Sequence, residues 1–167
     1  MSTEVTRHLL LDELHELYDM ERQMARALPR MAELVTLPRF KAALLAQLSE
    51  CRNQVQRLAC LLSDLGQSVR KRTTRTLSRL VDEHGSVVFP GASSESMNRE
   101  LLQLARRIEL SEITLCGCAM TYADLLGYVD VVRVLRATLE EKEATESQLH
   151  RVERLPEPLW ISAAPVQ

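Results

Sequence analysis

The stretch "RRIELSEITLCGCAMTYADLLG", residues 106–127, has the pattern of a helix with a carboxylate inside its apolar face. Apolar residues such as Ile108, Leu115 and Leu126 recur through it at helical spacing. Glu112 falls within that stripe. A buried carboxylate is costly unless another group neutralises it or donates hydrogen bonds to it. The stretch therefore predicts a helical core with a polar interior, and the rest of the chain must supply the partner of Glu112.

The composition of the whole chain agrees with a helical protein. A length of 167 residues fits one domain, and 46% hydrophobic residues fit a folded globular protein. Leu, Ala, Glu and Arg, which are good helix formers, dominate, whereas only 4% of the residues are aromatic. With 5 glycines in the chain, many tight hairpin turns are not expected. The composition predicts an all-α fold.

Apolar periodicity divides the chain into four long helices and one short one. The predicted long helices cover roughly 5–35, 38–65, 99–126 and 130–154, and the short one lies near 75–88. Residue types at the boundaries support these limits. Pro38 suits a first helical turn, and Gly66 and Gly127 are expected to end helices. Asn98 and Asp130 are the predicted N-caps of the third and fourth long helices.

The lengths of the connections predict the topology. Short links join the first long helix to the second and the third to the fourth, so each pair forms an antiparallel hairpin. About thirty residues separate the two hairpins, which is enough to cross from one end of a bundle to the other. The prediction is a ferritin-like four-helix bundle over 1–155 whose long crossover carries the short extra helix. Residues 156–167 are predicted to form a C-terminal tail, which Trp160 attaches to the body.

Charge and targeting signals narrow the expected partners and compartment. The net charge of -2 makes a nucleic-acid partner unlikely as the main role, and the basic run at 69–79 is interpreted as a solvated loop. Neither a signal peptide nor a stretch of membrane-spanning length is recognised, so no membrane partner is expected. The four cysteines do not form a disulfide framework. The expected compartment is the cytoplasm.

Polar residues interrupt the apolar stripes at matching places in the two hairpins. A glutamate on the first helix of each hairpin is followed, about 30 residues later, by a polar pair at positions i and i+4. These residues are Glu21, Glu50 and Gln54 in the first hairpin, and Glu112, Lys142 and Glu146 in the second. Pairing the hairpins gathers the set at the middle of the bundle. Four-helix bundles build dinuclear carboxylate metal sites in this way.

Five stretches resemble the bacterial YciE/YciF stress-protein family, in order and over about residues 9–150. They are "LYDMERQMARALPRMA" (17–32), "LSECRNQVQRL" (48–58), "IELSEI" (108–113), "LLGY" (125–128) and "TLEEKEATESQL" (138–149). Members of that family are ferritin-like bundles, generally dimeric, with a di-iron-type site. The resemblance implies a stress-associated homodimer with an iron site, and by ligand hardness a carboxylate-rich site without histidine also suits manganese. The implied metal ligands are Glu21, Glu50, Gln54, Glu109, Glu112 and Glu146.

Lys142 departs from the family pattern at the position that matters most. The family tends to have a run of three acids here, and Lys142 takes the third, inward position. A protonated ammonium offers no acceptor and cannot ligate a metal. Two hypotheses follow for the partner of Glu112: a metal of a di-iron or di-manganese centre, or Lys142 itself, with Arg52 as a further candidate. In the second case the protein is a metal-free scaffold that acts through protein contacts. The sequence assigns no catalytic residue.

Overall fold

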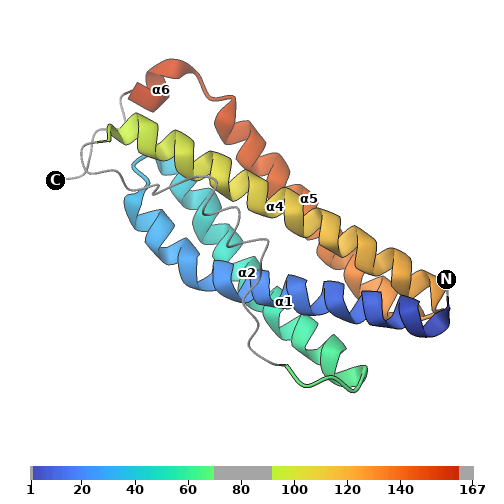
Figure 1. Ribbon diagram of the computed structural model, residues 1–167. Coiled ribbons are helices and arrows are strands. Elements are labelled where there is room, and N and C mark those ends of the chain that lie inside the picture. Colours follow the sequence, from blue (N-terminus) through green and yellow to red (C-terminus); the bar gives the residue numbers. More distant parts are fainter. Residues whose placement is uncertain (1, 70–91, 162–167) are drawn as a thin grey trace.

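The computed structural model describes residues 2–69 and 92–161. These residues form five helices. Four helices are long and carry an apolar stripe, because residues three and four apart share one face of a helix. The fifth is a single short turn near the C-terminus. The helices are α1 (Thr3–Leu34), α2 (Pro38–Asp64), α4 (Ser94–Leu125), α5 (Val129–Glu153) and α6 (Glu157–Ile161) (Figure 1).

The four long helices pack as two antiparallel hairpins. Residues 35–37 join α1 to α2, and residues 126–128 join α4 to α5 (Figure 1). Helix α1 packs against α2 and α4, and α5 packs against α4 and α2, so the helices surround one core. The predicted all-α bundle is confirmed. The predicted helix near 75–88 and nearly all of the basic run lie outside the described residues.

Proline and glycine set three helix boundaries as expected. Pro38 is the first residue of α2, where its missing N–H costs nothing because no acceptor precedes it. Gly66 follows α2 with a φ of 75°, and Gly127 follows α4 with a φ of 71°. Residues with a side chain rarely adopt this left-handed backbone conformation, so glycine ends both helices at little cost in free energy.

Both predicted N-caps are wrong. Ser93, not Asn98, caps α4. The Ser93 hydroxyl oxygen accepts a hydrogen bond from the backbone N–H of Ser96 in the first turn of the helix. Asn98 lies fully buried inside α4, and its amide contacts Thr36 in the link between α1 and α2. Tyr128 precedes α5, and Asp130 lies in the first turn of that helix. Asn98 therefore joins α4 to the link between α1 and α2 and does not cap a helix.

The apolar core is divided into two clusters. One, around Leu28, Phe40 and Ile108, fills the end of the bundle where α1 turns into α2. The other, around Leu14 and Leu135, fills the end where α4 turns into α5. The residues that interrupt the apolar stripes lie between the two clusters. The fold thereby encloses a polar layer between two apolar layers.

The beginning of the predicted tail is ordered as α6. Trp160 on α6 is only 1% exposed, and its indole N–H donates to the carbonyl oxygen of Leu155 at 3.1 Å. The guanidinium of Arg99 on α4 lies 4.5 Å from the centre of the Trp160 ring. Trp160 therefore attaches this segment to the bundle, as predicted. No helix in the described ranges is long and apolar enough to cross a membrane.

Candidate functional site

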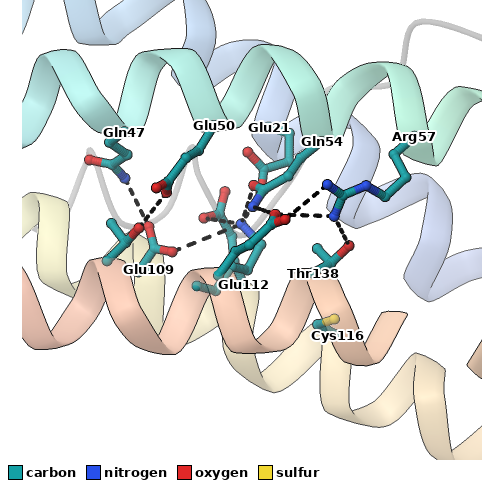
Figure 2. Close-up of polar contacts among 12 residues, drawn as sticks. Glu21, Gln47, Glu50, Gln54, Arg57, Glu109, Glu112, Cys116 and Thr138 are labelled. Atoms are coloured by element: carbon teal, nitrogen blue, oxygen red, sulfur yellow. Dashed lines mark hydrogen bonds and ion pairs between the residues drawn. The ribbon is translucent and has the colours of Figure 1, made fainter. Parts of the chain in front are cut away.

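The ammonium of Lys142 is the centre of the polar layer. The side chain is 1% exposed, and its Nζ donates to Oε1 of Glu21, to Oε1 of Gln54 at 3.2 Å and to Oε2 of Glu112 at 3.1 Å. An ammonium has three N–H donors, and each of them has an acceptor here. Figure 2 shows Glu21, Gln54 and Glu112 converging between the helices. Lys142 is thus the buried partner that Glu112 required.

The helical stripes bring these four residues together. Glu21 follows Leu17 on the inner face of α1, and Glu112 follows Ile108 on that of α4. Lys142 lies seven residues, or two helical turns, after the buried Leu135 on α5. Each polar residue therefore points inward because its apolar neighbours fix the face of the helix. Each of the four long helices contributes one side chain to the contact.

Glu109 and Glu50 form a second group beside Lys142. Oε1 of Glu109 lies 4.0 Å from the Lys142 ammonium, and its Oε2 accepts from the Gln47 amide at 2.8 Å. Glu50 accepts from the Thr145 hydroxyl at 2.6 Å. Glu109 is 2% exposed and its contact with Gln47 is buried, whereas Glu50 is half-buried and its contact with Thr145 is only partly buried. The carboxylates of this group are held by uncharged donors.

A third group fixes the orientation of Gln54. Its amide nitrogen donates to Glu141 at 2.9 Å, so its oxygen is the atom that faces Lys142. The Arg57 guanidinium donates to both carboxylate oxygens of Glu141, at 3.1 and 2.9 Å, and to Thr138 at 2.9 Å. Such charge-assisted contacts are among the stronger hydrogen bonds in proteins. The group holds α2 to α5 beside the buried layer.

The structure gathers all but one of the residues that the resemblance implied. Glu146 is bound instead by Arg106 on α4, whose Nη2 and Nε lie 2.5 and 2.9 Å from Oε1. Its side chain is 17% exposed, so it is less deeply buried than the groups in contact with Lys142. Arg52, the further candidate partner of Glu112, is exposed on α2. Arg52 is therefore not part of the layer.

Five polar residues of the layer were not predicted from the sequence: Gln47, Arg57, Thr138, Glu141 and Thr145. The signal for two of them was present in the helical spacing. Gln47 lies one turn before Glu50, and Thr145 lies one turn after Lys142. Neither was predicted, because an uncharged polar side chain on an apolar stripe does not indicate that a charged group is buried beside it. Arg57 lies at the edge of the stripe, where spacing alone does not give direction.

Burial shifts the proton affinity of the charged groups. Desolvation, followed by the charge of Glu109, raises the pKa of Glu112 well above its ordinary value. Desolvation and the nearby Glu50 raise the pKa of Glu109 to about 8. Desolvation lowers the pKa of Lys142 to about 7. The carboxylates in contact with Lys142 oppose its shift, because each stabilises the ammonium. The three contacts of Nζ favour the ion-paired state.

The arrangement of these residues does not fit a pair of metal ions. Within residues 2–69 and 92–161, no group of three or more His, Cys, Asp or Glu side chains is arranged to hold a metal ion. The Lys142 ammonium lies between the oxygens of Glu112 and Gln54 at hydrogen-bonding distances of 3.1 and 3.2 Å. Divalent ions bind oxygen at about 2.0–2.6 Å and are repelled by a neighbouring ammonium. Lys142 takes the central position.

The chain matches a known protein family and a known protein over most of its length. Residues 5–154 match a protein family described as a domain of unknown function, DUF892. Protein YciF of Escherichia coli (strain K12) is 26% identical over 150 residues, which cover 89% of this chain and 90% of YciF. Both matches span the helices that build the polar layer.

Two solved structures share the fold. The crystal structure of the E. coli stress protein YciF gives a TM-score of 0.80 at 25% identity, covering 88% of this chain and 93% of YciF. The structure of YcfI from Rhodopseudomonas palustris, for which a structural role has been suggested, gives 0.81 at 28% identity, covering 90% and 94%. These likenesses confirm the resemblance and the ferritin-like helical bundle that the sequence predicted.

Proposed function

The chain belongs to the DUF892 family, and from this membership we propose that it is a stress-associated structural protein that acts through protein contacts. The E. coli relative is described as a stress protein, and a structural role has been suggested for the R. palustris relative. The proposal assigns no enzymatic reaction to the polar layer. It keeps the cytoplasm as the compartment, which agrees with four free cysteines.

The observation that carries the proposal is the enclosure of the polar layer. Glu21 and Glu112 are 0% exposed and Lys142 is 1% exposed. Apolar clusters close the layer on both sides along the bundle. A reacting group must come within hydrogen-bonding distance of its substrate, and these groups contact only one another and neighbouring side chains. The layer therefore serves the fold, and function falls to the outer surface.

A di-iron or di-manganese centre is the competing function. The resemblance implies it, and the carboxylates of the layer are ligands that manganese and iron accept. The contacts of Lys142 favour the metal-free alternative, because its ammonium already neutralises charge between Glu21 and Glu112. Of the implied ligands, Glu146 is committed to Arg106. We therefore rank the metal-free scaffold first.

The assembly is proposed to be a homodimer, as the resemblance implies. A surface that binds a second copy buries side chains that are exposed on the single chain. Several large apolar side chains are exposed in this way: Val5, Leu45, Leu110, Leu125, Val129, Leu159 and Ile161. They supply apolar area for a protein contact.

The test combines metal analysis with mass measurement on freshly purified native protein. Elemental mass spectrometry is expected to find iron and manganese far below one ion per chain, before and after incubation with ferrous iron. Light scattering behind a sizing column is expected to give twice the 19.0 kDa of one chain. Iron or manganese near one ion per chain, with catalytic oxidation of ferrous iron, would show that the metal-centre function is the correct one.

A further inference from the structure

We propose that the Lys142 ammonium is a built-in cation that replaces a divalent ion, so that the polar layer is a latent divalent-cation site which opens when that ammonium is removed. The inference concerns the inner layer alone and does not depend on the proposed protein-contact function. Lys142, whose protonated ammonium cannot ligate a metal ion, lies at the centre of the residues that the resemblance implies as metal ligands.

The contacts of Lys142 resemble the ligand set of a cation. Three oxygens from three different helices point at its Nζ: a carboxylate from α1, an amide oxygen from α2 and a carboxylate from α4. Carboxylate and amide oxygens are the ligands that suit manganese and magnesium. The oxygen of Gln54 is held toward the centre by the contact of its nitrogen with Glu141. The Gln54 oxygen is thus positioned independently of Lys142.

The layer also contains more carboxyl oxygens than one ammonium satisfies. Glu109 lies 4.0 Å from Nζ in addition to the two carboxylates that Lys142 contacts directly. Oε2 of Glu21 and Oε1 of Glu112 are buried and accept no hydrogen bond from the described part of the chain. Buried acceptors of this kind are normally satisfied by a donor or a cation. A divalent ion in place of Nζ gains these oxygens as ligands.

Removing the ammonium therefore has two opposite consequences. Without a cation, the variant leaves buried carboxylates facing one another, which strongly destabilises the fold. With a divalent ion, the same carboxylates become ligands, and binding to the folded state alone restores stability by mass action. A mere structural lysine predicts only the first consequence. Rescue by metal is the result that separates the two explanations.

The test compares native protein, Lys142→Gln and Lys142→Glu, each titrated with Mn²⁺. The resonance signal of free aqueous Mn²⁺ counts bound ions, and thermal unfolding reports stability. Native protein is expected to bind no Mn²⁺ in the layer and to unfold at the same temperature with and without it. Both variants are expected to unfold at lower temperature without metal and to bind Mn²⁺. At about 100 times the dissociation constant, Mn²⁺ then multiplies their folded-to-unfolded ratio by about 100.

Arg106→Gln is the matched control, because it also removes a cation that neutralises glutamates. Arg106 contacts Glu146 and Glu153 at a half-buried position, where its side chain is 19% exposed. This control is expected to lose stability and to gain nothing from Mn²⁺. If a Lys142 variant fails to fold without metal, the yield of refolding with and without Mn²⁺ replaces the melting measurement.

Two results would overturn the inference. One is stoichiometric Mn²⁺ binding by native protein that Glu112→Gln abolishes. The other is that both Lys142 variants, like the Arg106 control, neither bind Mn²⁺ nor refold better with it. Metal-insensitive variants of a dimeric native protein refute the latent site and leave the protein-contact function standing. If Mn²⁺ rescues the variants and the native protein is monomeric, the latent site stands and the proposed protein contact is refuted.

Discussion

Replacing Lys142 by alanine tests whether its ammonium holds the buried carboxylates together. The change removes the donor to Glu21, Gln54 and Glu112. Lys142 is 1% exposed and both glutamates are 0% exposed, so the carboxylates that lose their donor are shielded from bulk water. Removing one partner of a buried ion pair costs about 3–5 kcal/mol. Since small domains are stable by about 5–15 kcal/mol, the loss is a large share of the total.

Equilibrium unfolding in urea measures this loss. With a slope of about 2 kcal/mol per molar, a loss of about 4 kcal/mol lowers the midpoint by about 2 M urea. Circular dichroism follows the four long helices, and the fluorescence of the single tryptophan, Trp160, follows the docking of α6. Coincident transitions by the two probes establish two-state unfolding, which the free-energy comparison requires.

Arg133→Ala serves as the control for Lys142→Ala. Arg133 pairs with Asp130 on the surface of α5, where the two side chains are 73% and 87% exposed. Exposed pairs contribute little, so this change is expected to cost less than about 0.5 kcal/mol.

A second mutation sharpens the test of Lys142. In the Lys142→Ala background, Glu21→Gln is expected to restore stability, because it removes a carboxylate that the first change left unpaired. A Lys142→Ala midpoint within about 0.5 M of native at an unchanged slope, with no recovery on adding Glu21→Gln, would show that the ammonium does not hold the carboxylates together.

Three further predictions follow from other contacts. Trp160→Ala, which empties a site that is 1% exposed, is expected to cost about 3 kcal/mol and to speed proteolysis near α6, as measured by urea unfolding and mass spectrometry. Asn98→Ala removes the amide contacts to Thr36 and is expected to cost about 1–3 kcal/mol, whereas an unchanged melting temperature contradicts the role given to Asn98. The pKa of Glu109 is raised from 4.5 to about 8, so its contribution to stability is full below pH 4.5 and is lost as the pH rises through about 8. Relative to native protein, Glu109→Gln is therefore expected to gain stability between pH 5 and 9 in urea titrations, and equal slopes with pH contradict the raised pKa.

The polar layer shows how far helical spacing alone could predict contacts. Glu21 and Glu112 were predicted to face inward, and they do, because each lies among apolar residues of its own helix. Such a prediction uses only the period of 3.6 residues, which is a local property. The partner of each residue is not local. Whether Glu112 meets an ion or an ammonium depends on a side chain that lies thirty residues away on another helix.

Glu146 shows where this reasoning fails. It lies one turn after Lys142, about 40° around α5 at about 100° per residue, and the spacing alone allows it to face inward. That rotation carries it toward α4, where Arg106 takes its carboxylate. Thr145 is rotated the other way and contacts Glu50 on α2. A rotation of this size separates a buried ligand from a half-buried ion pair, and spacing does not resolve it.

The four long helices, their inner faces, the two hairpins and the family were therefore predictable, because each depends on local periodicity, connection length or shared residues. Which polar side chains meet depends on how the helices pack against one another. This packing placed the Lys142 ammonium among oxygens of three helices, gave Asn98 a buried contact in place of the predicted cap, and attached α6 to the bundle through Trp160. The physical reason is that a periodic sequence fixes the direction of a side chain only to a sector of its helix, whereas a buried charge requires a partner at a particular atom.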